Sequence, residues 1–146
     1  MSDYRNHIGI IGGGISGLTL GCALLKQGIP AIIFEKMPEE TSHGAAISLS
    51  SNALRLLDRL DIYNDLKNQS FVHSSASIQG PQMEISSFPT PEVLTTRRQT
   101  LISLLYSRYI NLGGEIFHHH DFASFDVAKC EVTFTNENKY LSLIHI

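Results

Sequence analysis

Short apolar runs and a helical repeat alternate along the first 35 residues. Residues 7–11 and 31–34 are continuous apolar runs next to glycine or proline, which predicts two buried strands of a parallel sheet. Between them, apolar side chains recur at three- and four-residue spacing over residues 15–27, which predicts a helix. Gly28 stands where a helix C-terminus favours glycine, and Pro30 forbids continuation. We therefore expect a strand–helix–strand unit.

Two further helices are expected in the middle of the chain. One starts near Asn52 after a capping serine, with an inward face of Ala53, Leu56, Leu57 and Leu60. The other runs from Thr96 or Arg97 to Leu112, ends at Gly113, and carries an apolar stripe of Leu101, Leu104, Leu105 and Tyr109.

The remaining segments predict short strands and turns. Residues 75–78 and 83–85 alternate in polarity, Gly80-Pro81 marks a turn between them, and residues 88–91 predict a connector. Further strands are expected over 115–120, 123–127 and 131–135, and a last extended segment follows the turn at 136–138.

Composition narrows the class of protein. The 146 residues are 42% hydrophobic and 17% charged, which is typical of a folded domain rather than a disordered chain. Eleven basic and 14 acidic residues give a net charge of −3 without a basic run, so nucleic acid is not an expected partner. No apolar stretch is long enough for a membrane span. Cys22 lies far from Cys130 and inside the helical apolar pattern, so we expect a buried free thiol rather than a disulfide, and a reducing, cytoplasmic compartment.

The sharpest motif is a run of glycines after the first strand. Gly12, Gly14 and Gly17 match G-x-G-x-x-G. The first glycine permits a tight turn, the second lets the backbone approach a pyrophosphate, and the third lets the helix pack closely on the strand. The N-terminus of that helix, at Ile15 and Ser16, offers N–H groups to phosphates. This combination predicts dinucleotide binding, and a tight turn without a ligand is the alternative.

An acidic residue follows the second strand at the expected distance. Glu35 lies 18 residues after Gly17, where a carboxylate can accept hydrogen bonds from ribose hydroxyl groups. The same charge would repel a 2′-phosphate, which disfavours an NADP-type ligand at this position.

The three consecutive histidines at 118–120 do not predict a metal site. On a strand only His118 and His120 share a face, and two ligands without a third make a poor site. We expect no metal.

Four stretches together resemble the N-terminal part of FAD-dependent monooxygenases of the aromatic-hydroxylase type, the single-component class A kind. They are the glycine motif with its strand, residues 34–36, residues 44–47 leading into 52–57, and Arg98-Gln99-Thr100-Leu101. The resemblance covers about residues 5–140.

The resemblance implies a fold, a cofactor and a set of contacts. The implied fold is α/β, a Rossmann-like FAD-binding domain in three layers, with a parallel sheet and an antiparallel meander. Gly12, Gly14, Ile15, Ser16 and Gly17 would hold the FAD pyrophosphate, Glu35 with Lys36 the adenosine ribose, Gly44, Ala45 and Ala46 the flavin end, and Arg98 the pyrophosphate and ribityl chain. Arg97 is the alternative to Arg98.

The implied reaction is hydroxylation of a small organic substrate with O2, with NADH or NADPH as the transient reductant of the flavin. No residue here is a convincing catalytic acid, base or nucleophile. Another FAD- or NAD-linked oxidoreductase is one alternative, although a Cys-x-x-x-x-Cys redox pair is absent from the early helix. A non-catalytic nucleotide-binding fragment is the other.

The resemblance also implies a domain division and a longer parent protein. Residues 1–70 and 94–140 would form part of the FAD-binding domain, and residues 71–93 an excursion that begins a substrate-binding sheet. Residues 141–146 depart from the family pattern, so we expect a truncated chain with a non-native tail there and no hydroxylation by the chain as given.

Overall fold

The computed structural model describes residues 3–38, 44–78 and 86–145. It divides into two units, Met1–His43 with Leu105–Ile146, and Gly44–Leu104. Each unit has its own sheet, and each is described by itself below.

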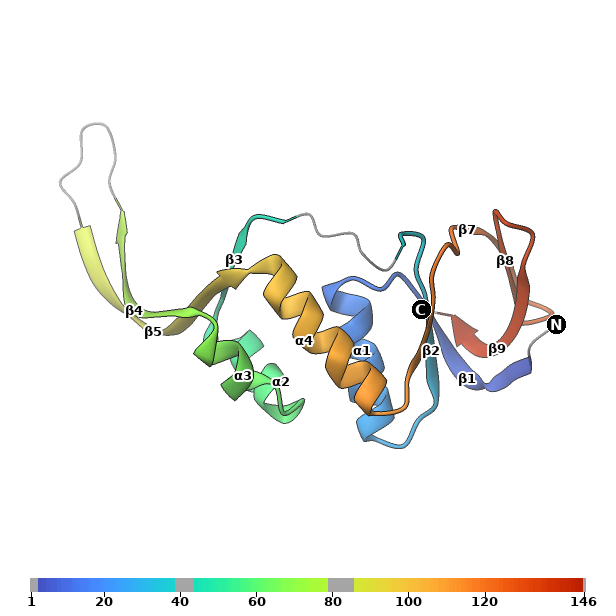
Figure 1. Cartoon of the computed structure of the whole chain (residues 1–146), viewed down its shortest axis with the longest axis horizontal. Helices are drawn as coiled ribbons and strands as arrows, with labels where there is room; N and C mark the ends of the chain where they lie inside the picture. Colours follow the sequence, from blue (N-terminus) through green and yellow to red (C-terminus); the bar gives the residue numbers. More distant parts are fainter. Residues whose placement is uncertain (1–2, 39–43, 79–85, 146) are drawn as a thin grey trace. The chain divides into compact units, whose positions relative to one another are not determined.

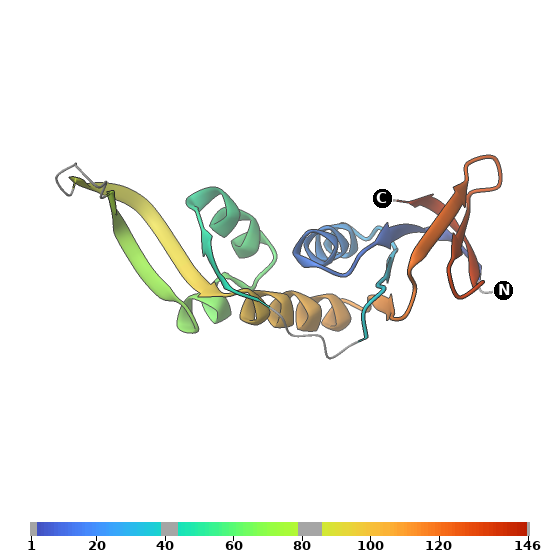
Figure 2. The ribbon, with the colours of Figure 1, turned by 90° about the horizontal axis from the view of Figure 1, so that it is seen from above.

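The first unit is built on a six-stranded sheet with the order β6-β2-β1-β9-β8-β7. Strands β1 (Asp3–Ile11), β2 (Ala31–Phe34), β6 (Glu115–Phe117) and β9 (Lys139–His145) are parallel, whereas β7 (Phe122–Asp126) and β8 (Glu131–Phe134) are antiparallel additions. Helix α1 (Ile15–Lys26) lies on one side of β1 and β2, and the β7–β8–β9 meander lies on the other (Figures 1 and 2). These are the expected three layers of an α/β fold.

Strand β2 supplies the core of both layers because its side chains alternate between the two faces of the sheet. Ile32 and Phe34 join a buried cluster with the meander residues Val132, Phe134 and Tyr140. On the helix side, a Cβ added to Gly21 of α1 would lie 2.6 Å from the ring of Tyr109 and 3.2 Å from Ile33. A glycine inside α1 therefore allows the end of helix α4 (Arg98–Asn111) to pack against α1.

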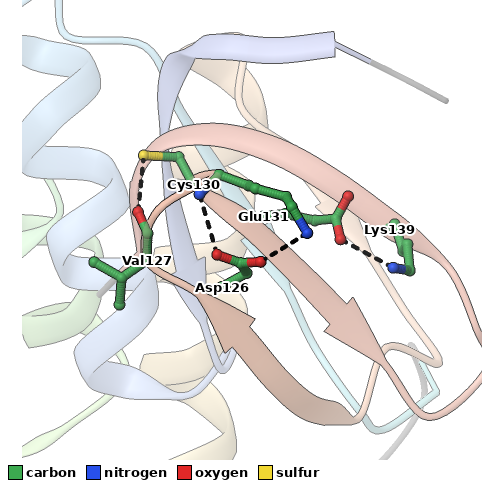
Figure 3. A network of polar contacts seen from close by, with 6 residues as sticks. Asp126, Val127, Cys130, Glu131 and Lys139 are labelled. Atoms are coloured by element: carbon green, nitrogen blue, oxygen red, sulfur yellow. Dashed lines mark hydrogen bonds and ion pairs between the residues drawn. The ribbon is translucent and has the colours of Figure 1, made fainter.

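The strand–helix–strand prediction is confirmed. Helix α1 begins at Ile15 and ends within one residue of the expected position, and Gly28 has the left-handed φ of +73° typical of this place. The hairpin of β7 and β8 is also confirmed, and its turn is held by Asp126, which accepts hydrogen bonds from the backbone and side chain of Lys129 (Figure 3).

The second unit contains a three-stranded antiparallel sheet with the order β3-β5-β4. Its strands are β3 (Ala46–Leu49), β4 (Phe71–Ile78) and β5 (Ser86–Arg97), and its helices are α2 (Ser51–Arg59), α3 (Tyr63–Asn68) and the first residues of α4. Leu54, Leu57 and Leu60 are buried in this unit together with Leu66 of α3.

Several expectations for this unit are wrong. Leu56 is 42% exposed, and Leu54 takes its place on the inward face of α2. Helix α3 is six residues long, too short to show a repeat, and was not expected. Thr96 and Arg97 end strand β5 instead of starting a helix, which begins at Arg98.

The expected connector at residues 88–91 is also wrong, because these residues lie within β5. Two prolines fit there for a local reason. Strand β3 pairs with Leu94–Arg97 and does not reach Pro89, so the N–H group that proline lacks is not required for pairing with β3. Pro91 lies where the register of β5 with β4 shifts, between His73 and Ser75. The expected strand at 83–85 and the turn at Gly80-Pro81 lie outside the described residues.

Strand β6 is shorter than expected, since it ends at Phe117 rather than at residue 120. His119 has a φ of +59°, which breaks the extended backbone. The expected extended segment after residue 138 is present as β9, which includes residues 141–145 of the segment expected to be a non-native tail.

Candidate cofactor-binding site

The turn between β1 and α1 has a geometry that only glycine satisfies at two places. Gly12 has a φ of +103°, and its N–H donates a hydrogen bond of 2.8 Å to the carbonyl of Phe34 in β2. A Cβ on Gly17 would overlap the carbonyl oxygen of Gly12 and lie 3.3 Å from Ile10. The chain therefore reverses tightly here, and α1 lies directly on β1.

Gly14 leaves the start of the helix open. It is the N-cap of α1, makes no side-chain cap, and a Cβ built on it would meet nothing within 4 Å. The first helical hydrogen bond joins the N–H of Leu18 to the carbonyl of Gly14, so the N–H groups of Ile15 and Ser16 precede the helical ladder. No acidic side chain lies in the first turn of α1. The positive end of the helix dipole is thus free for an anion.

Glu35 is held against this turn. Its Oε2 accepts a hydrogen bond of 2.5 Å from the N–H of Gly13, and its Oε1 accepts one of 2.8 Å from the N–H of Met37. A carboxylate has about four acceptor positions, so about two remain for other donors. The carboxylate therefore lies at the edge of the glycine turn and can accept about two more hydrogen bonds.

The backbone of Glu35 is fixed by β6 and the segment after it. Its N–H donates to the carbonyl of Phe117 at 2.8 Å, and its carbonyl accepts from the N–H of His120 at 2.9 Å. The sequence could not predict the Gly13–Glu35 hydrogen bond or the backbone hydrogen bonds of Glu35, because no spacing rule connects residues 13, 35 and 120. Lys36 follows as an exposed residue.

A second group of predicted site residues lies together in the other unit. The N–H of Arg98 donates a hydrogen bond of 3.2 Å to the carbonyl of Ala45, and a Cβ on Gly44 would lie 3.0 Å from the Cβ of Arg98. Ala46 pairs in register with Arg97. The Gly44–Ala46 segment and the start of α4 are therefore one local structure, with both arginines exposed.

Gln99 is a site candidate that the sequence reasoning missed. Its Oε1 is buried and has no hydrogen-bond partner among the described residues, while its Nε2 lies 3.5 Å from the Oγ of Ser103. A buried acceptor without a donor is uncommon. Its position next to Arg98 was the only available signal.

The histidines at 118–120 do not lie on one strand. His120 is buried, its Nδ1 lies 2.7 Å from the carbonyl of His118, and its Nε2 lies 3.0 Å from the hydroxyl of Tyr140. These partners make it part of the core. Within the described parts of the chain, no three His, Cys, Asp or Glu residues are grouped so as to hold a metal ion. No described helix is long and apolar enough to cross a membrane.

A parallel sheet, a glycine turn into a helix and an acid after the next strand define the class of dinucleotide-binding α/β proteins. The chain belongs to a family of FAD binding domains, whose profile matches residues 5–139.

Similarity to individual proteins supports this family membership. The chain is 34% identical over 122 residues to an FAD-dependent monooxygenase, nodM, of Hypoxylon pulicicidum, a match that covers 75% of this chain and 26% of that protein. The structure of 2-methyl-3-hydroxypyridine-5-carboxylic acid oxygenase is similar with a TM-score of 0.82 and 25% identity, over 92% of this chain and 37% of that one. The structure of p-nitrophenol 4-monooxygenase PnpA from Pseudomonas putida DLL-E4 has a TM-score of 0.86 at 15% identity, over 99% of this chain and 40% of that one, which shows the shared fold. The chain spans about a quarter of the length of the first curated relatives it matches.

Proposed function

We propose that this chain is the nucleotide-binding part of an FAD-dependent monooxygenase that hydroxylates a small organic substrate with O2 and NADH or NADPH. The family membership supports FAD as the cofactor. The curated relative and the two solved structures named above are all oxygenases, which supports the reaction class.

The residues present fit the ADP half of FAD. Gly12, Gly14 and Gly17 with Ile15 and Ser16 would hold the pyrophosphate at the N-terminus of α1, because a Cβ on Gly14 would meet nothing within 4 Å and the first turn of α1 contains no acidic residue. Glu35 would accept hydrogen bonds from the ribose, with Lys36 beside it. In the other unit, Gly44, Ala45 and Ala46 would lie along the flavin end, and Arg98 would contact the pyrophosphate and ribityl chain.

When bound, FAD supplies the redox chemistry, taking electrons from the nicotinamide and passing them to O2. The described residues contribute binding and orientation, and none of them is proposed as an acid, base or nucleophile.

The observation that carries the proposal is the Glu35 carboxylate held 2.5 Å from the Gly13 N–H. This contact supports the proposed role of Glu35 as an acceptor for a ribose hydroxyl, because it holds the carboxylate beside the turn that would bind the phosphates. If Glu35 contacts the ribose, its negative charge would repel a 2′-phosphate, which favours FAD over an NADP-type ligand at this turn.

The test is the FAD affinity of the Glu35→Gln protein, which keeps the shape of the side chain and removes its charge. Loss of charge-assisted hydrogen bonds should weaken FAD binding by about 1–3 kcal/mol. Calorimetric titration measures it, and Glu137→Gln, at an exposed acid in a turn, is the matched control. Wild-type affinity in the Glu35→Gln protein overturns the assignment.

The reductant is tested by adding NADH or NADPH to the FAD-loaded protein without oxygen. The proposal predicts that one of them bleaches the visible absorbance of the flavin. A flavin that neither nucleotide reduces favours a nucleotide-binding chain without this activity.

We extend the proposal to the domain division and location. Residues 1–70 and 94–140 would belong to the FAD-binding domain, and residues 71–93 would begin a substrate-binding sheet. The antiparallel pairing of β4 with β5 supports the second assignment. The two free cysteines support a reducing, cytoplasmic compartment.

A further inference from the structure

A cavity of about 220 Å³ lies at the edge of the six-stranded sheet where the parallel strands begin. Tyr4 and His7 of β1, Ala31 at the start of β2 and Glu115 at the start of β6 line it, and Gly28 and Gly113, which follow the ends of α1 and α4, complete its wall. The glycine turn lies at the other end of β1, so the cavity is separate from the candidate FAD site.

An irregularity in β1 brings two of these side chains together. Residues three apart on a regular strand point to opposite faces. The pairing of β1 with β9 shifts register between Tyr4 and Ile8, and the rings of Tyr4 and His7 lie edge to face with centroids 5.1 Å apart. Such bulges re-aim side chains near functional sites.

The polar groups of the cavity are mainly acceptors. The Tyr4 hydroxyl donates its proton to Oε2 of Glu115 at 3.2 Å, which leaves the lone pairs of both groups for other donors. Burial, and next the Glu115 carboxylate, raise the pKa of Tyr4, so this hydroxyl keeps its proton at neutral pH. The Nδ1 of His7 is buried without a partner among the described residues, and this nitrogen can accept a hydrogen bond.

The backbone adds to this negative character. The ends of α1 and α4 lie at this edge, and the C-terminus of a helix carries the negative end of its dipole. The basic residues of the last turns, Lys26 and Arg108, do not line the cavity, and none of its lining residues is Lys or Arg. Leu25, Ile29 and Pro30 provide an apolar wall.

We infer that this cavity binds a small organic ammonium ion, with the cation against Glu115 and Tyr4 and the hydrocarbon part against Leu25, Ile29 and Pro30. The volume suits a group slightly larger than benzene, since a cavity of about 150 Å³ binds benzene in another protein. Benzylamine has this size and charge. The inference does not depend on the oxygenase activity.

The experiment titrates benzylamine into the FAD-loaded protein at neutral pH and follows backbone amide shifts by NMR. We expect a Kd of about 1 mM, which eight non-hydrogen atoms can support. The largest shifts should fall on Gly28 and Gly113. Benzyl alcohol and benzoate, which match the shape without the positive charge, should bind a few-fold more weakly, because the pair with the exposed Glu115 is screened by solvent.

Three variants locate the site. Glu115 is exposed, so solvent screens its charge and Glu115→Gln should weaken benzylamine binding a few-fold. Tyr4→Phe keeps the ring packed and should also weaken it a few-fold. Ile29→Trp, at a residue 40% exposed, should fill the cavity and block binding. Glu137→Gln is the matched control and should bind as the wild type does.

Three results would each overturn the inference: no shifts at about 10 mM benzylamine, equal binding of benzyl alcohol, or wild-type binding in folded Tyr4→Phe and Ile29→Trp proteins. If Glu115→Gln does not fold, these two variants still decide the outcome.

Discussion

The hydroxyl of Tyr109, near the end of α4, donates a hydrogen bond of 2.8 Å to the carbonyl of Ala31 at the start of β2. The side chain is fully buried, and its hydroxyl also lies 3.2 Å from the carbonyl of Glu115. Burial raises the pKa of Tyr109 well above its usual value, so the hydroxyl remains a donor. One side chain thus ties the end of α4 to the beginnings of two parallel strands.

Tyr109→Phe should therefore destabilise the fold. The substitution keeps the ring and leaves the Ala31 carbonyl without this donor, which should lower the free energy of unfolding by about 1–2 kcal/mol. Urea denaturation followed by circular dichroism measures the change. A loss below about 0.3 kcal/mol would mean that this hydrogen bond does not contribute to stability.

Gly17→Ala should disrupt the turn from β1 into α1. The new methyl group would overlap the carbonyl oxygen of Gly12, and overpacking of this kind costs about 1–3 kcal/mol. Ser16→Ala, one residue earlier at an exposed position, is the matched control and should leave stability unchanged or slightly raised. Equal unfolding midpoints for the two variants would contradict the close contact of α1 with the turn.

The two cysteines should react at very different rates. Cys22 is fully buried and donates its S–H to the carbonyl of Leu105, whereas Cys130 is exposed. Burial raises the pKa of Cys22 to about 11, so its reactive thiolate is scarce at pH 8. Titration with a chromogenic disulfide should detect one thiol in the native protein and two in denaturant, and Cys130→Ser should remove the native signal.

The raised pKa of Cys22 also makes the stability of the fold depend on pH. An unfolded thiol loses its proton near pH 9, before the folded one does, so the free energy of unfolding should fall as the pH rises from 9 toward 11. Cys22→Ala should reduce this alkaline slope. An identical slope with and without Cys22 would assign the effect to other groups.

The parts of the fold that the sequence predicted well are those with a repeated signal. Two apolar runs, a helical repeat and Gly28 were enough to locate β1, α1 and β2. The exposed Leu56 shows the limit of such patterns, because the helical repeat permits either Leu54 or Leu56 on the inward face and packing selects Leu54.

The failures have local physical causes. Pro89 and Pro91 are strong turn signals, but both fit within β5. Among the described residues, β3 does not extend to Pro89, and Pro91 lies at the register shift between β5 and β4. The left-handed φ of His119 ends β6 without glycine or proline to signal it. The Gly13–Glu35 hydrogen bond depends on the tertiary fold and leaves no trace in spacing.

If the turn from Gly12 to Gly17 holds the FAD pyrophosphate, as we propose, Gly14→Val should lose its affinity for FAD. Gly14 has an ordinary φ of −75°, and its Cβ would meet no protein atom within 4 Å, so valine should leave the fold intact. The side chain would instead occupy the space proposed for the phosphates. We expect the circular dichroism spectrum of the Gly14→Val protein to match that of the wild type. Calorimetric titration with FAD should give a Kd raised at least about 100-fold. A folded Gly14→Val protein that binds FAD with wild-type affinity would show that the phosphates do not lie at this turn.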